Sequence, residues 1–234
     1  MRPDINWLQH LPENRLMAEM SLWSADLMRI ADEMERIERF TDIYHIDVAD
    51  GAFSPALLFF PDLVAAIRKK TNKPIHVHLM VADAILESQV DQFVEAGADL
   101  ISVHAENRNA DAALAKIANA KLLAGLVLQV HTPVNAANPF LGRISFLTLL
   151  GTAIGVKGQG LDPAANGRLS QARALIASQS KHRIVLAADG GIREHTVPGL
   201  CNAGAQTIVM GSLAMNAPDL PARMAWVHAQ HMAA

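Results

Sequence analysis

Short apolar runs alternate with longer amphipathic segments eight times along the 234 residues. The apolar runs are nearly continuous, which is typical of parallel strands that are buried on both faces. We expect strands within 17–23, 43–48, 75–81, 99–105, 122–130, 144–151, 183–191 and 206–212. We expect helices within 25–40, 61–71, 84–97, 110–120, 132–140, 169–179, 194–204 and 220–230.

Eight strand-then-helix units over this length predict an α/β protein with a (β/α)8, or TIM, barrel. A doubly wound open sheet is the alternative, but eight regular units favour closure. The sequence contains no linker or low-complexity tract that would indicate a second domain. We therefore expect residues 1–234 to form one barrel domain, in which about residues 1–16 are a short lead-in before the first strand.

Composition excludes several classes of partner. The net charge is −3 and no long basic run occurs, so neither nucleic acid nor an acidic membrane surface is expected to bind. The N-terminus has no apolar core of a signal peptide, and no window is apolar enough to span a membrane. A lone cysteine, Cys201, excludes an internal disulfide framework. These features predict a soluble, cytoplasmic protein.

Ionisable residues stand at the ends of several expected strands, where active sites of this fold lie. Residues two apart on a strand share one face, so His45 and Asp47 point the same way, as do His76, His78 and Met80. If that face is the barrel interior, His45, Asp47, His78 and Asp189 converge from three strands. Two imidazoles and two carboxylates suit Zn²⁺, Mn²⁺, Co²⁺ or Fe²⁺.

Three neighbouring loops are rich in glycine: "GVKGQG" after the sixth strand, "DGG" after the seventh and "GS" after the eighth. Each could be an ordinary turn with positive φ. Backbone N–H groups in such loops also cradle anions, and barrels often bind phosphate after strands 7 and 8. Three adjacent loops of this kind favour a phosphate site.

Six segments, taken in order, resemble the ribulose-phosphate 3-epimerase family from about Met20 to Met215. "SLWSADL" is similar to the family's opening S-[IL]-L-[SA]-[AS]-D-[FL], "HIDVADGAFSP" to H-x-D-[VI]-M-D-G-x-F-V-P and "HVHLMV" to D-[VC]-H-L-M. "GVKGQG", "ADGGI" and "VMGSLAM" resemble the later G-F-G-G-Q, V-D-G-G and V-x-G-[ST]-x-[IL]-F segments. The resemblance implies a (β/α)8 barrel of the ribulose-phosphate-binding type.

The resemblance also implies roles for individual residues. His45, Asp47, His78 and Asp189 match the family's ligands for one divalent metal ion, with Zn²⁺ as the first expectation and Fe²⁺, Mn²⁺ or Co²⁺ as alternatives. Asp47 and Asp189 match its two catalytic carboxylates. The positions that match substrate-binding residues are Ser21, His78, Met80, Gly155, Val156, Lys157, Gly158, Gly190, Gly191, Gly211 and Ser212.

Other positions depart from the family pattern. Ala49 and Leu150 stand where the family has methionines, and Ala52 and Ala56 replace a histidine and an asparagine. Lys157 lies where the phosphate loop has glycine. These changes surround the expected substrate rather than the catalytic set, so they leave open which ketose phosphate is bound.

The implied activity is that of a metal-dependent ketose-phosphate 3-epimerase, an isomerase of carbohydrate metabolism. D-Ribulose 5-phosphate and D-xylulose 5-phosphate of the pentose phosphate route are the expected pair, and D-allulose 6-phosphate is an alternative substrate. Epimerisation at C3 passes through an enediolate and needs one carboxylate on each face of that carbon. A non-catalytic sugar-phosphate-binding barrel is an alternative from another class. The resemblance also implies a homo-oligomer.

Three further ionisable residues have less defined roles at this point. We expect His76 and His104 to be core groups or to support the metal ligands rather than to bind metal. Asp50 either orients His45 or its loop, or is an ordinary turn residue before Gly51. In a related group of sugar-phosphate decarboxylases, the second strand carries a segment similar to D-x-K-x-x-D. Asp47 to Asp50 contain no lysine, which argues against that activity.

Overall fold

A computed structural model describes residues 2–4 and 6–230, and within them eight parallel strands close into a barrel in the order β1 to β8. The expected (β/α)8 fold is confirmed. The strands are β1 Met17–Ser21, β2 Ile43–Ala49, β3 Ile75–Met80, β4 Leu100–His104, β5 Leu123–Leu128, β6 Phe146–Leu150, β7 Val185–Asp189 and β8 Thr207–Met210.

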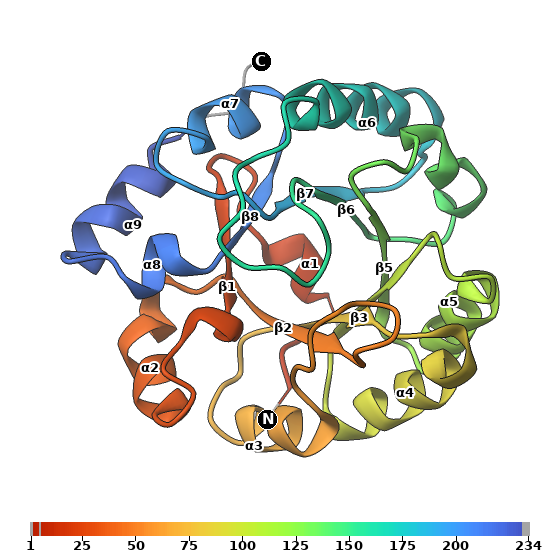
Figure 1. The fold of residues 1–234 in the computed structure, drawn as a ribbon, viewed down its shortest axis with the longest axis horizontal. Helices are drawn as coiled ribbons and strands as arrows, with labels where there is room; N and C mark the ends of the chain where they lie inside the picture. The colour runs from red at the N-terminus through yellow and green to blue at the C-terminus, as the bar shows by residue number, and fades with distance from the viewer. Residues whose placement is uncertain (1, 5, 231–234) are drawn as a thin grey trace.

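Helices surround the strands as an outer ring, which Figure 1 shows in a view along the barrel. The α-helices are α1 Trp7–His10, α2 Ile30–Ile37, α3 Pro61–Arg68, α4 Asp83–Ala96, α5 Ala110–Asn119, α6 Ala165–Gln179, α7 Val197–Asn202, α8 Ser212–Met215 and α9 Leu220–His228. Most of the apolar core lies between this ring and the barrel, where residues such as Ile46, Val77 and Phe93 are fully buried. Burial on both faces explains why the strands read as continuous apolar runs.

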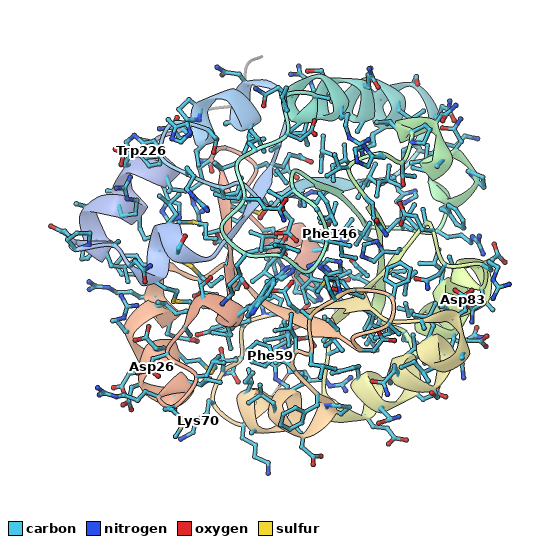
Figure 2. All side chains as sticks on the ribbon, in the orientation of Figure 1. Asp26, Phe59, Lys70, Asp83, Phe146 and Trp226 are labelled. Atoms are coloured by element: carbon cyan, nitrogen blue, oxygen red, sulfur yellow. The ribbon has the colours of Figure 1, made fainter. Side chains whose placement is uncertain are left out.

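The lead-in before β1 closes the N-terminal end of the barrel. Helix α1 lies within the ring of strands in Figure 1, and Trp7 packs on Phe146, whose ring centroid is 6.2 Å away. A small apolar cluster surrounds this pair: Leu11, Met17, Ile43, Leu100 and Val185. Figure 2 places Phe146 near the centre of the barrel, whereas Lys70 and Asp83 lie at its periphery. The apolar cluster fills the N-terminal end of the barrel, and the open space lies at the opposite, C-terminal end.

Most expected element boundaries shift by a few residues in the structure, and two of the differences change the kind of element. The segment 132–140, expected as an α-helix, is a 3₁₀ helix η3 over Val134–Phe140. It contains Pro139, whose ring in an α-helix would clash with the carbonyl four residues earlier. The first strand ends at Ser21 rather than residue 23, since Leu22–Ser24 turn into a 3₁₀ helix η1. Among the described residues, the helices are all too short or too polar to cross a membrane.

Candidate active site

A cavity of about 300 Å³ opens at the C-terminal ends of the strands. Its floor includes Asp47 of β2, His78 and Met80 of β3, and Asp189 of β7. Its rim is formed by the loops that follow β6, β7 and β8. The cavity thus lies where barrels of this type carry out chemistry.

The four expected metal ligands converge at the floor of this cavity. One ligand atom from each of His45, Asp47, His78 and Asp189 lies within 4.8 Å of all the others. Nδ1 of His78 is 3.4 Å from Oδ1 of Asp47 and 3.7 Å from Oδ2 of Asp189. Nε2 of His45 is 3.2 Å from the same Oδ1 of Asp47. Two imidazoles and two carboxylates at this spacing fit a divalent cation such as Zn²⁺.

The hydrogen bonds of His78 support this fit. Its Nδ1 is buried and has no hydrogen-bond partner, although it faces two carboxylates. Its Nε2 lies 2.9 Å from Nε2 of His104, and Nδ1 of His104 lies 3.1 Å from Oε2 of Glu106. Because Glu106 only accepts, His104 donates from Nδ1 and accepts at Nε2 from His78. His78 is then left with a lone pair on Nδ1, which is what a metal ligand requires.

Beneath the cavity, a second polar group occupies the interior of the barrel. Glu19 of β1 is fully buried, and its Oε2 lies 2.9 Å from Nδ1 of His45 and 2.8 Å from Nδ1 of His76. Nε2 of His76 lies 2.6 Å from Oγ of Ser102. His76 therefore supports the site from below and lies farther from the cavity than His45.

The two carboxylates that face the cavity have different electrostatic surroundings. Burial alone would raise the pKa of Asp47, but the adjacent His45 and His78 lower it below its usual range. Burial raises the pKa of Asp189 to about 6, and the Asp47 charge adds to this effect although the His45 charge opposes it. Ser21 also donates a 2.8 Å hydrogen bond to Oδ2 of Asp47. One carboxylate is thus readily ionised while the other is readily protonated, which suits a base and an acid.

Burial alone would lower the pKa of His45, but the charges of Asp47 and Glu19 and the hydrogen bonds to both together raise it well above its usual value. The ring lies between the carboxylates of Glu19 and Asp47, which favour its protonated form. A metal ligand must be unprotonated, so metal binding would release this proton.

The glycine-rich loops form one side of the cavity, and two adjacent glycines show why that residue is needed. Gly190 and Gly191 both have positive φ, of 85° and 69°. A Cβ on Gly191 would lie 2.8 Å from the backbone Cα of Leu161, so a side chain there would displace the loop. The expected phosphate-binding residues that line the cavity are Gly155, Val156, Lys157, Gly158, Gly190, Gly191, Gly211 and Ser212.

Lys157 links two of the loops around the cavity. Its Nζ donates to the backbone oxygen of Trp23 at 2.5 Å and lies 4.8 Å from the centroid of the Trp23 ring. Burial lowers the pKa of Lys157, whereas the charge of Asp47 opposes that change. Lys157 is exposed, and its amino group is directed to Trp23 at the rim of the cavity.

Two expected residues do not line the cavity itself. Ser21 and His45 lie just beneath its floor, where both contact Asp47. Asp50 holds its own loop: its carboxylate accepts from the backbone N–H groups of Ala52, Phe53 and Ala82. It orients that loop and not His45.

Sequence reasoning missed Glu19. The signal was present, because Glu19 is two residues before Ser21 and so faces the interior with it. An acidic residue inside the apolar run "MAEMS" also has to find a buried partner.

Known proteins are similar to most of this chain. Residues 17–215 match the ribulose-phosphate 3 epimerase family. Ribulose-phosphate 3-epimerase 1 of Cupriavidus necator is 33% identical over 215 residues, which cover 90% of this chain and 88% of the relative. Ribulose-phosphate 3-epimerase of Bacillus subtilis is 30% identical over 201 residues, which cover 85% of this chain and 92% of the relative.

Solved structures with a similar fold include 3-hexulose-6-phosphate synthase from Salmonella typhimurium. Its TM-score is 0.67 at 15% identity, covering 91% of this chain and 97% of that one. Orotidine 5'-phosphate decarboxylase from Pyrococcus horikoshii OT3 has a TM-score of 0.63 at 15% identity, covering 92% and 98%. At this identity the likeness concerns the barrel fold alone.

Proposed function

This chain belongs to the ribulose-phosphate 3 epimerase family and is therefore an isomerase, and we propose that it interconverts D-ribulose 5-phosphate and D-xylulose 5-phosphate. The observation that carries the proposal is the placement of Asp47 and Asp189. They reach one cavity floor from β2 and β7, with carboxylate oxygens within 4.8 Å of each other and of two imidazoles. Binding a sugar phosphate would not need a pair of facing carboxylates, whereas inversion at C3 does.

Proton transfer follows from the unlike surroundings of the two carboxylates. Asp47, with a lowered pKa, removes the C3 proton from one face. Asp189, with a raised pKa, delivers a proton to the other face. The two roles exchange when the reaction runs backwards. Because the C3 proton lies α to the C2 carbonyl, its removal gives an enediolate intermediate.

His45, Asp47, His78 and Asp189 would hold one divalent cation, for which Zn²⁺ is the first candidate. Such a cation would act as a Lewis acid toward the substrate carbonyl. The unpartnered Nδ1 of His78 supports this assignment, since a buried imidazole nitrogen without a partner is otherwise costly.

The glycine-rich loops would bind the phosphate through backbone N–H groups, with Gly190, Gly191 and Ser212 on the cavity wall. Met80 lines the same space. Ser21 would act on the substrate indirectly, through the hydrogen bond that its hydroxyl donates to Asp47. Lys157, within the glycine-rich loop after β6, would add a cation near the phosphate.

The test is a substrate panel. Exchange of the C3 hydrogen with deuterium from solvent, followed by NMR, should be fastest with D-ribulose 5-phosphate. Faster exchange with D-allulose 6-phosphate would reassign the substrate within the same chemistry. Tight binding of ketose phosphates without exchange would identify a binding protein instead.

A further inference from the structure

We propose that Glu19 is a positioning residue for the metal centre: it fixes the ring of His45 so that the Nε2 lone pair faces the cation. This inference rests on the proposed function, because it assumes that His45 binds a metal. Glu19 itself does not line the cavity, and it contacts the site through His45.

The contacts of Glu19 determine where the protons lie. A carboxylate only accepts hydrogen bonds, and Oε2 of Glu19 lies 2.9 Å from Nδ1 of His45 and 2.8 Å from Nδ1 of His76. Both rings therefore carry their proton on Nδ1. Neutral His45 then has its lone pair on Nε2, the nitrogen that lies 3.2 Å from Asp47 among the expected ligand atoms.

The lower ring is fixed in the same way. With its proton on Nδ1, His76 accepts at Nε2 from the hydroxyl of Ser102, 2.6 Å away. Each nitrogen of the two rings thus has a defined donor or acceptor role. This order holds Glu19 in place, so the carboxylate cannot turn away from His45 without breaking the bond to His76.

Charge supports a functional role for Glu19. Burying a carboxylate is costly unless it is paired, and the described contacts of Glu19 are two imidazoles, with Oε1 left without a partner. An apolar residue would fill the same space without that cost. A carboxylate behind a metal-binding histidine raises the basicity of the ring and orients it. This role would explain why a charged residue, rather than an apolar one, is buried at position 19.

The test compares Glu19→Gln, which keeps the shape and removes the charge, with two control variants. Ser102→Ala removes a partner of His76 but none of His45. Asp99→Asn removes a different buried carboxylate, the one paired with Arg68 at 2.5 Å and outside the cavity. The dissociation constant for Zn²⁺ is measured for each by competition with a chelator, and the number of bound ions per chain is counted.

We expect Glu19→Gln to weaken Zn²⁺ binding by about 10- to 100-fold, and the two controls to leave it within a few-fold of wild type. In the zinc-loaded protein labelled with ¹⁵N-histidine, the His45 Nδ1 proton should resonate far downfield. It should move upfield in Glu19→Gln and stay in place in Asp99→Asn. A residue that only fills space would change neither the affinity nor this resonance.

Unchanged affinity in Glu19→Gln, with wild type binding one ion, would overturn the role of Glu19 and leave the proposed function intact. Two ions in wild type and one in the variant would make Glu19, His45 and His76 a metal site themselves, which also contradicts the proposal. If wild type binds no divalent ion, the metal part of the proposed function fails as well. Should the variant not fold, the wild-type spectrum alone decides: metal on Nδ1 of His45 excludes the role.

Discussion

Asp47 and Asp189 present carboxylate oxygens within 4.8 Å of each other, although they come from strands β2 and β7, which β1 and β8 separate in the barrel. Closing the sheet brings these distant positions together at one cavity floor. Their unlike electrostatic surroundings give the pair two chemical roles. The proposed proton transfer depends on this arrangement of the two carboxylates.

The first prediction concerns the acid and base themselves. Asp189→Asn should lower kcat for ketose-phosphate epimerisation by about 10³-fold or more, because an amide cannot transfer the proton. The same loss is expected for Asp47→Asn. Asp99→Asn, which removes a buried carboxylate outside the cavity, serves as the control and should lower stability but keep kcat near wild type. Near-normal turnover in Asp189→Asn would show that this carboxylate is not an acid or base.

Metal removal gives the second prediction. Treatment with a chelator should abolish epimerase activity, and Zn²⁺ should restore it. At a metal concentration 100 times its Kd, the folded state gains about 2.7 kcal/mol, so the melting temperature should rise by roughly 5–10 °C. His78→Gln should lose this rise, while His195→Gln, a change at an exposed histidine, should retain it. Full activity in protein shown by elemental analysis to lack metal would refute a metal centre.

The third prediction concerns stability at acid pH. Although burial raises the pKa of Glu106, hydrogen bonds from His104, Thr132 and the Gln129 backbone lower it from 4.5 to about 2. The unfolded chain therefore takes up this proton first as the pH falls. The stabilisation is fully present above about pH 4.5 and is lost toward pH 2.

Urea unfolding between pH 2.5 and 7, in the presence of a chelator, measures this effect. The difference in free energy of unfolding between wild type and Glu106→Gln should be largest near neutral pH and shrink below pH 4.5. A difference that is independent of pH would mean that the Glu106 charge does not stabilise the fold.

The lead-in supplies the fourth prediction. Trp7→Ala should lower the free energy of unfolding by about 3–5 kcal/mol, because Trp7 is only 7% exposed and packs on Phe146 inside the barrel. Trp226→Ala should cost less, since Trp226 is only partly buried, against Arg223 on the outer surface. Chemical denaturation measures both. Equal losses would mean that α1 does not close the barrel.

Much of the fold could be predicted from the sequence, because each strand is a continuous apolar run and each run is followed by an amphipathic segment. The convergence of His45, Asp47, His78 and Asp189 also followed, since alternation along a strand decides which side chains point inward. The confirmed barrel needs no information beyond these two patterns.

The contacts beneath the cavity could not be predicted in the same way. In the register between β1 and β2, Glu19 lies opposite Ile43, and Ser21 lies opposite His45. Glu19 reaches His45 because its side chain is long enough to extend toward the next layer of the barrel. The closure by Trp7 was also missed, because the lead-in has no periodic pattern and its position depends on space left inside the completed barrel.

Proton transfer by two different carboxylates can be tested by epimerising D-ribulose 5-phosphate in D₂O and stopping the reaction at low conversion. If Asp47 removes the proton and Asp189 supplies its replacement, NMR of the D-xylulose 5-phosphate formed will show deuterium at C3, while the remaining substrate keeps hydrogen there. Product that retains the substrate's own C3 hydrogen would mean that a single group moves the proton between the two faces, and that Asp47 and Asp189 do not divide the transfer between them.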